Sequence, residues 1–288
     1  MKALVVTNCA TAAYTSGLRA LFPDWEVKGA ELNTARNWVG GEPNPSFIEF
    51  LASTDLVLTA MPDEPMFAGN AKLVVPAFHF RAYHPDSFHL SCGDVAIQSV
   101  LKSGNLHSRI AATAFLLGMS RNDAIAAFDA GTYERTGYFA VFEAEKTELL
   151  QRFALHGIDL AAAFDRWTQT GNFLYTYNHP KASIFSDVLL QALKARFIES
   201  RQMASARATL ATVPDYLEPS IRWPVYPEIA ALYRFDSEMV WRTGRDAGSV
   251  SMSLEDFVGR SFEVLQTLSD ISADCIPGFA QCRDALQD

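Results

Sequence analysis

A cysteine residue stands at the end of the first apolar run of the chain. Residues 3–6 are Ala-Leu-Val-Val, and Thr7, Asn8 and Cys9 follow them. The short β-branched run is typical of a buried strand, and residues 10–21 carry apolar side chains at helical spacing. Cys9 would then lie at a strand-to-helix junction, where the N–H groups of a helix start lower a thiol pKa. We predict that Cys9 is a nucleophile and that Asn8 stabilises an oxyanion; the alternative is an inert, buried cysteine.

A polar cluster follows a later apolar run. Arg81, His84 and Asp86 lie a few residues after residues 72–77, a predicted strand. A histidine beside a cysteine can take its proton, and a carboxylate can orient the imidazole. We predict His84 as this base, with Asp86 as its orienting group, and Arg81 adds a positive charge to the same cluster. The alternative is that His84 is an ordinary loop histidine.

Two further polar segments precede predicted helices. Asn178, His179 and Lys181 surround a proline that suits a first helical turn, so Lys181 and Asn178 could bind a phosphate or carboxylate there. His179 is an alternative base. Arg109 begins another helix and is a further candidate for an anion, or a solvated charge. No His-Glu-x-x-His or paired-cysteine spacing indicates a metal site.

The elements that must position these residues change in character along the chain. Four predicted strands with long intervals indicate parallel βαβ connections; they are residues 3–6, 25–30, 55–60 and 72–77. After them, helical spacing predominates; it covers residues 94–103, 107–117, 122–130, 143–155, 160–168, 183–201 and 254–268. The predicted fold class is α/β, with a small parallel sheet and flanking helices at the N-terminus followed by a mainly helical C-terminal part. We expect residues 1–92 to carry the nucleophile and residues 93–288 to pack on them and close the site.

Charge and cysteine content narrow the function classes. The chain has 24 basic and 33 acidic residues and a formal charge of −9, which argues against a general nucleic-acid or anionic-membrane surface. No stretch reaches the ~20 apolar residues that cross a membrane. Four scattered cysteines predict reduced thiols in a cytoplasmic protein.

Several short motifs occur together in a characteristic order. They are Asn8-Cys9, Ala-Tyr-His-Pro-Asp at residues 82–86, His107-Ser108, and Asn-His-Pro-Lys at residues 178–181. Together they resemble the WcbI-type polysaccharide biosynthesis family, acetyltransferases linked to bacterial capsule formation, over most of residues 1–200. Members usually carry Gly-Asn-Cys-Gln where this chain has Thr-Asn-Cys-Ala. The resemblance implies binding of coenzyme A and transfer of an acetyl group from acetyl-coenzyme A to a sugar hydroxyl. The phosphates of this cofactor would need cationic partners, for which Arg81, Arg109 and Lys181 are the candidates.

Several mechanisms and functions remain open at this point. Cys9 could carry the acyl group as a thioester, or a histidine could activate the sugar hydroxyl for direct transfer while Cys9 lines the pocket. A thiol esterase or deacetylase would use the same residues, with water as the acceptor. A non-catalytic module that binds coenzyme A or a glycan is the third possibility. We expect a small-molecule acyl donor and a saccharide acceptor as partners, and a homodimer is compatible with the apolar helices.

Overall fold

The computed structural model describes residues 1–102, 104–194, 196–244 and 248–287. These residues form two compact units, each built from three stretches of the chain. The first unit comprises residues 1–79, 147–169 and 179–218, and the second comprises residues 80–146, 170–178 and 219–288. The boundary expected after residue 92 lies inside the second unit.

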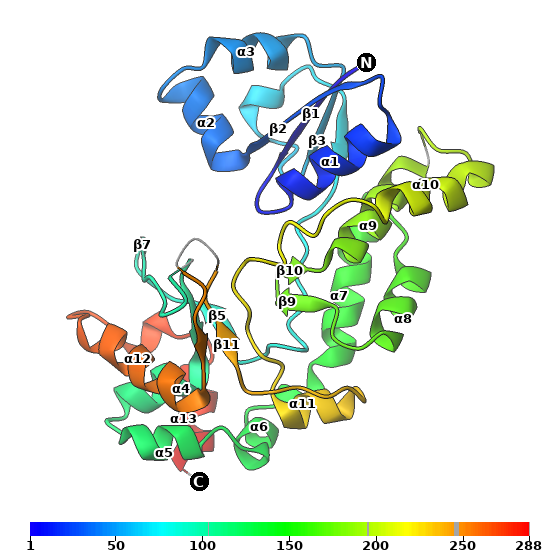
Figure 1. The fold of residues 1–288 in the computed structure, drawn as a ribbon. Helices are drawn as coiled ribbons and strands as arrows, with labels where there is room; N and C mark the ends of the chain where they lie inside the picture. Colours follow the sequence, from blue (N-terminus) through cyan, green and yellow to red (C-terminus); the bar gives the residue numbers. More distant parts are fainter. Residues whose placement is uncertain (103, 195, 245–247, 288) are drawn as a thin grey trace. The chain divides into compact units, whose positions relative to one another are not determined.

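The first unit contains a four-stranded parallel sheet in the order β2-β1-β3-β4 (Figure 1). The strands are β1 (Lys2–Thr7), β2 (Glu26–Glu31), β3 (Leu56–Thr59) and β4 (Lys72–Val74). Helix α1 (Thr11–Leu21) connects β1 to β2, while α2 (Leu32–Gly40) and α3 (Pro45–Ala52) connect β2 to β3. This arrangement confirms the predicted N-terminal α/β fold class.

Alternation along β1 explains how both faces of this sheet are covered. All residues from Ala3 to Val6 are buried. Leu4 and Val6 pack in one apolar cluster with residues of α2 and α3, such as Ala35 and Phe47. Successive side chains of a strand point to opposite faces, so Ala3 and Val5 face the other side of the sheet. The unbroken apolar run of the sequence therefore reflects a strand that is buried on two faces.

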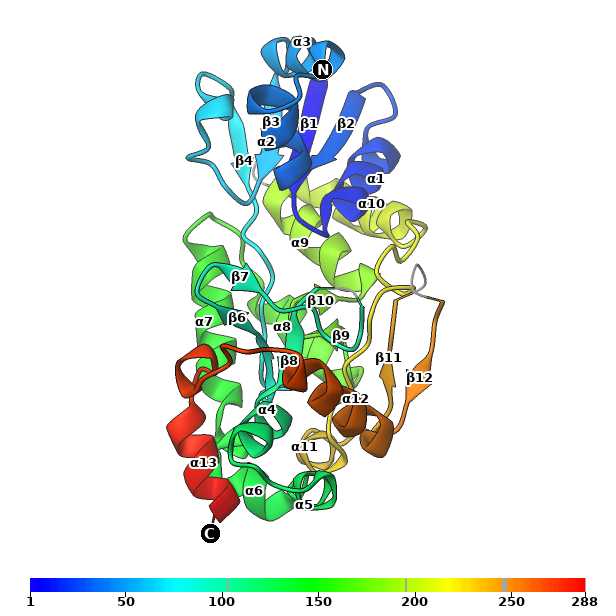
Figure 2. The ribbon, with the colours of Figure 1, turned by 90° about the vertical axis from the view of Figure 1, so that its left-hand side faces the viewer.

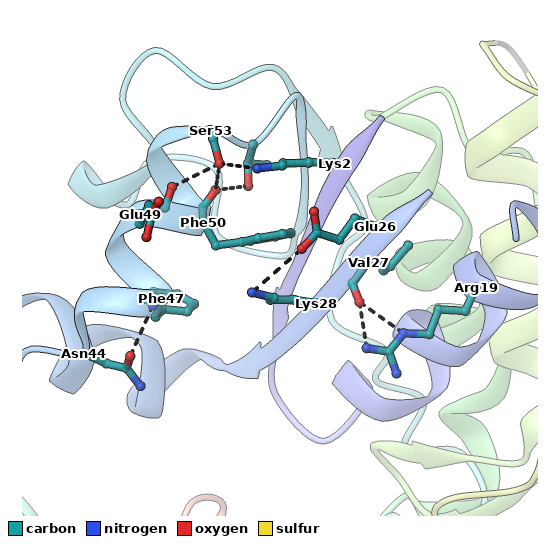
Figure 3. A network of polar contacts seen from close by, with 11 residues as sticks. Lys2, Arg19, Glu26, Val27, Lys28, Asn44, Phe47, Glu49, Phe50 and Ser53 are labelled. Carbon is teal, nitrogen blue, oxygen red and sulfur yellow. Dashed lines mark hydrogen bonds and ion pairs between the residues drawn. The ribbon is translucent and has the colours of Figure 1, made fainter. Parts of the chain in front are cut away.

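Polar contacts fix the helices around the sheet edge (Figure 3). The Asn44 side chain accepts a hydrogen bond from the Phe47 N–H at 3.1 Å and so caps the start of α3. The Arg19 guanidinium of α1 donates to the Val27 carbonyl of β2 at 2.6 Å and 3.0 Å. The Lys28 ammonium lies over the Phe50 ring, 4.3 Å from its centroid. These contacts hold α1 and α3 against β2.

A second group of helices completes the first unit. Helix α1 packs against α9 and α10, which also pack against each other. The remaining elements of this unit are β10 (His179–Pro180), α7 (Phe142–Ala154, from residue 147 onward), α8 (Ala161–Gln169), α9 (Ala182–Lys194), α10 (Met203–Leu210) and the short 3-10 turns at Pro65–Phe67 and Ser200–Gln202. Within the described residues the predicted helix at 183–201 therefore ends at Lys194.

The second unit is mainly helical and has short antiparallel strand pairs (Figure 2). Its helices are α4 (Arg109–Leu116), α5 (Arg121–Ala126), α6 (Ala130–Arg135), α11 (Pro227–Leu232), α12 (Leu254–Gln266) and α13 (Phe279–Gln287). Its strands are β5 (Ser87–His89), β6 (Ser91–Cys92), β7 (Val95–Ala96), β8 (Leu106–Ser108), β9 (Leu174–Thr176), β11 (Trp241–Arg242) and β12 (Ser251–Met252), and 3-10 turns lie at Tyr138–Ala140 and Ala273–Cys275. A mainly helical part thus follows the sheet, as predicted.

Two expectations fail in this unit. Residues 94–102 form β7 and turns rather than a helix, because Asp94, Val95 and Ala96 are exposed at a hairpin and bury no apolar face; residue 103 lies outside the described residues. The expectation of four reduced thiols is also wrong. Cys92 and Cys275 form a disulfide with Cα atoms 5.1 Å apart, because β6 packs against the turn at Ala273–Cys275.

A glycine in β2 provides a test of the packing between α1 and the sheet. A Cβ atom on Gly29 would overlap the Thr15 hydroxyl of α1 and lie 3.1 Å from the methyl group of Thr11. We expect Gly29→Ala to lower the free energy of unfolding by about 1–3 kcal/mol, measured by urea denaturation. Gly40→Ala is the control: its Cβ meets nothing within 4 Å, so it should not destabilise the fold. Equal effects of the two changes would contradict this packing.

Candidate functional site

Cys9 follows the carboxyl end of β1, where the strand order of the sheet reverses. Chain connections lead from β1 to β2 on one side, and β3 and β4 lie on the other side of β1. In open α/β sheets such a switch point, outside the carboxyl ends of the strands, is where ligands bind. The position of Cys9 between β1 and α1 is thus the junction that the sequence predicted.

Backbone and hydroxyl contacts hold this junction in one conformation. The Asn8 carbonyl accepts hydrogen bonds from the Thr11 N–H at 3.1 Å and from the Thr11 hydroxyl at 2.8 Å. The Thr11 hydroxyl also lies 2.9 Å from the hydroxyl of Thr7 at the end of β1. Asn8 is exposed, and Cys9 is half-buried. The turn therefore presents the Asn8 side chain to solvent and fixes the backbone beside the thiol.

Burial sets the electrostatics of the Cys9 thiol. Desolvation raises its pKa from 9.0 to about 11, the backbone amide groups of Cys9 and Ala10 lower it, and the Glu31 carboxylate raises it. The backbone N–H groups at the helix start therefore lower the pKa of Cys9, as expected, but by less than burial raises it. The prediction of a low pKa is wrong for the free protein, in which Cys9 is a neutral thiol at pH 7.

The raised pKa predicts slow alkylation. We expect the rate of Cys9 modification by iodoacetamide, followed by peptide mass spectrometry, to rise about tenfold per pH unit between pH 8 and 10, because only the thiolate reacts. Extrapolation of the alkylation rate to higher pH should give a titration midpoint near the thiol pKa of about 11. A plateau below pH 8 would contradict the burial of this thiol.

Helices α1 and α9 run side by side in the same direction. The rings of Tyr14 in α1 and Phe185 in α9 lie 5.4 Å apart, centroid to centroid, and a Cβ on Gly17 would lie 2.6 Å from Leu189. The residue numbers of the contacting pairs therefore increase together along α1 and α9, so the two helices are parallel. Their N-terminal ends therefore lie at the same end of the pair.

This parallel packing places two of the predicted site segments at one end of the first unit. One residue separates Cys9 from the start of α1, Lys181 directly precedes α9, and His179 lies three residues before α9 begins. All three are partly exposed. The first N–H of α9, that of Ala182, donates to the Asp215 carboxylate at 2.8 Å. A carboxylate of the chain thus takes one of the N–H groups predicted to bind a cofactor phosphate.

His84, our predicted base, lies in the core of the second unit. Its exposed fraction is 1%, and burial lowers its pKa to about 3, which the backbone of Trp223 partly opposes. The buried neutral ring cannot reach a solvent-borne substrate in this conformation. His84 therefore has the character of a buried core histidine, whereas the alternative considered from the sequence was an ordinary loop histidine.

Asp86 has other partners than the histidine it was expected to orient. Its carboxylate accepts hydrogen bonds from the Tyr226 hydroxyl at 2.6 Å, from the Ile110 N–H at 2.9 Å and from the Tyr138 hydroxyl at 3.0 Å. Asp86 is fully buried. Its role is to join the start of α4 to two core tyrosines, so the expectation that it orients His84 is wrong.

The remaining predicted residues have different surroundings within the second unit. The Arg109 guanidinium donates to the Pro85 carbonyl at 3.3 Å and to the Tyr138 hydroxyl at 3.4 Å, and its contact with a cofactor stays a prediction. Asn178 accepts a hydrogen bond from the Thr176 hydroxyl at 2.8 Å. Of the predicted cations, Arg81 is exposed, and Arg109 and Lys181 are half-buried.

Sequence reasoning missed Glu31 as a neighbour of the thiol. Glu31 ends β2 and pairs in register with Thr7, the last residue of β1. It lies with Thr11 and Ser16 along an open groove of about 420 Å³ beside α1. Strand ends of a parallel sheet meet at one edge, so a polar residue at the end of the second predicted strand was the available signal.

These observations define an α/β protein with a cysteine at the switch point of a small parallel sheet. Residues 2–199 match the model of the WcbI family, described as polysaccharide biosynthesis enzyme WcbI, and the chain belongs to this family. A solved structure of WcbI, described as a novel polysaccharide biosynthesis enzyme, matches with a TM-score of 0.67 and 15% sequence identity. The match covers 99% of this chain and 98% of that chain.

The description of that solved structure concerns coenzyme A. It states that the native protein is without a disulfide bond between coenzyme A and a cysteine. No curated protein matches this chain. Within the part of the chain that the structure describes, no helix has the length and apolar character needed to cross a lipid bilayer. The same residues contain no group of three or more metal-ligating side chains.

Proposed function

We propose that this protein is an O-acetyltransferase that moves an acetyl group from acetyl-coenzyme A to a sugar hydroxyl in bacterial polysaccharide biosynthesis. The observation that carries the proposal is the position of Cys9 at the switch point of the sheet, at the same end of the first unit as His179. Membership of a family described as polysaccharide biosynthesis enzymes supports it, as does the coenzyme A named for the similar structure.

In the proposed reaction Cys9 receives the acetyl group. The Cys9 sulfur attacks the thioester carbonyl, a base takes the thiol proton, and the coenzyme A thiolate leaves and is protonated. The base is needed at the moment of attack because Cys9 has a raised pKa. His179 is the proposed base, since it lies at the same end of α1 and α9 and is partly exposed. Asn8 and the N–H groups of the junction are the proposed oxyanion donors.

Lys181, which lies in the first unit with Cys9, is the proposed contact for a phosphate group of the donor. Asn178 lies in the second unit, and its contact with the cofactor stays a prediction. A cation or a backbone N–H is the usual partner of a phosphate in a protein that is acidic overall.

We propose that the reaction takes place in the cytoplasm, because acetyl-coenzyme A is the proposed donor. The disulfide between Cys92 and Cys275 would then have to persist in a reducing compartment. A homodimer stays a prediction.

Thermal-shift measurements with coenzyme A, acetyl-coenzyme A, a nucleotide-sugar and NAD test the proposed ligand class. A ligand that binds only the native state raises the melting temperature with concentration. We expect coenzyme A and acetyl-coenzyme A to do so, and NAD to have no effect. Stabilisation by NAD alone would contradict the proposal.

A non-catalytic module that binds coenzyme A is the second candidate. The raised pKa of Cys9 favours it, because a protonated thiol is a weak nucleophile. This candidate shares the thermal shift with coenzyme A. It differs in predicting no release of coenzyme A from acetyl-coenzyme A, with or without a saccharide.

A further inference from the structure

A histidine that the sequence analysis did not select lies where three segments of the second unit meet. His89 ends β5, which pairs antiparallel with β8 so that His89 lies opposite Leu106. The Phe80 N–H donates to the Tyr177 carbonyl at 2.8 Å and joins the segment of Arg81 to that of Tyr177. The His89 and Tyr177 rings lie 5.7 Å apart in an edge-on arrangement.

Asn105 fixes which nitrogen of His89 carries the proton. The Asn105 amide nitrogen donates to the Leu90 carbonyl at 3.1 Å and lies 3.4 Å from the Ser91 hydroxyl. A carbonyl oxygen only accepts, so the amide nitrogen must face Leu90 and the amide oxygen must face His89. That oxygen lies 2.6 Å from His89 Nδ1, which must then be the donor. In a neutral ring the lone pair is consequently on Nε2.

The Nε2 atom of His89 is available to a ligand. His89 is an exposed residue, and no hydrogen bond to Nε2 is present among the residues that the structure describes. Desolvation lowers the pKa of His89 below 6.5, the hydrogen bond with Asn105 raises it, and the Arg81 cation lowers it. His107 on β8 also interacts electrostatically with His89. The ring is therefore neutral at pH 7.5, with its lone pair unprotonated.

Arg81 supplies a positive charge beside this imidazole. Its guanidinium carbon lies 4.7 Å from the centroid of the Tyr177 ring, which restricts its movement. The side chain is exposed, and within the described parts of the chain no carboxylate forms an ion pair with it. The nearby Glu145 carboxylate accepts from the Arg81 backbone N–H at 2.7 Å. Tyr177 itself is buried and neutral, with a raised pKa.

We propose that His89, Asn105, Arg81 and Tyr177 form a recognition site for a negatively charged saccharide, one that carries a phosphate or carboxylate group. His89 Nε2 accepts a hydrogen bond from a sugar hydroxyl, and Arg81 pairs with the anionic group. An acceptor lone pair beside a cation selects a ligand that has both a hydroxyl donor and a negative charge. This inference rests on the proposed function, because it names the class of acceptor that the acetyl transfer would use.

Nuclear magnetic resonance of the ¹⁵N-histidine-labelled full chain tests the geometry without any acyl donor. We expect His89 to be the Nδ1–H tautomer at pH 7.5, whereas an Nε2–H tautomer would overturn the proposal. Arg81→Gln should raise the pKa of His89, because it removes the neighbouring cation. An unchanged pKa in that variant would show that Arg81 does not act on His89.

Binding of three probes tests the ligand class. Glucose 1-phosphate should bind, and His89→Gln and Arg81→Gln should each weaken its binding at least about tenfold, as expected for one lost charge-assisted or neutral hydrogen bond. Inorganic phosphate should respond to Arg81→Gln alone, and glucose should bind too weakly to measure. His156→Gln, at an exposed histidine of the first unit, is the control and should bind like the wild type.

The outcomes separate this inference from the proposed function. Equal glucose 1-phosphate affinity in the wild type and both variants, or no binding at all, would overturn the saccharide site. Such a result leaves acetyl transfer to other acceptors possible. Conversely, the protein could bind glucose 1-phosphate through His89 and Arg81 but never release coenzyme A. That result would support the saccharide site and contradict the proposed acetyl transfer.

Discussion

Cys9→Ala is expected to lower acetyl transfer from acetyl-coenzyme A at least about 10³-fold, the scale of losing a covalent nucleophile. The physical reason is that no other thiol of the first unit is available: Cys92, Cys275 and Cys282 lie in the second unit, and Cys9 alone follows the switch point of the sheet. The rate of coenzyme A release measures the effect. Intact-mass analysis of the wild type should show one acetyl adduct, which the variant lacks.

Cys282→Ala is the matched control for this experiment. Cys282 is a free, fully buried thiol of α13, and burial raises its pKa to about 12. Its removal should leave the adduct and the turnover in place, at some cost in stability. Turnover that persists in Cys9→Ala without an adduct would instead rule out the covalent route and favour direct transfer to the sugar.

The second large effect concerns stability. Asp86→Ala should lower the free energy of unfolding by about 3–5 kcal/mol, because buried hydrogen-bonding groups would lose their acceptor. These groups are the hydroxyls of Tyr138 and Tyr226 and the N–H of Ile110. Urea denaturation monitored by tyrosine and tryptophan fluorescence measures the change.

Two further variants serve as comparisons for the stability of Asp86→Ala. Asp86→Asn retains an acceptor oxygen and should destabilise less than Asp86→Ala. Asp94→Ala changes an exposed carboxylate of the same unit and should have an effect within about 0.5 kcal/mol. If Asp86→Ala were as stable as Asp94→Ala, the buried network described for Asp86 would be absent in solution.

The fold of the first unit was largely predictable because its strands carry strong local signals. The apolar runs before Asn8 and after Asp55 are buried on two faces, and their spacing requires parallel connections. Helix caps depend on equally local signals: Ser120 and Ser253 accept hydrogen bonds from the N–H groups three residues later, at 3.1 Å and 3.2 Å. These features depend on neighbours in sequence, which a single chain records directly.

The site was less predictable because its properties depend on distant partners. The sequence placed Cys9 at a helix start but could not show the burial that raises its pKa. His84 and Asp86 formed a plausible pair by spacing, yet Tyr138 and Tyr226, far away in sequence, bind the carboxylate. The disulfide joins residues separated by 183 positions, and no local pattern marks it. Tertiary burial decides each of these cases.

The chemical fate of a labelled acetyl group is the most direct test of this account. Acetyl-coenzyme A carrying ¹³C in its acetyl group is incubated with the full-length protein and a panel of neutral and phosphorylated saccharides, and the products are resolved by nuclear magnetic resonance. We expect a labelled sugar ester that forms with the wild type and is missing with Cys9→Ala. Labelled acetate as the sole product, or no consumption of acetyl-coenzyme A beyond the protein-free control, would contradict acetyl transfer as the function.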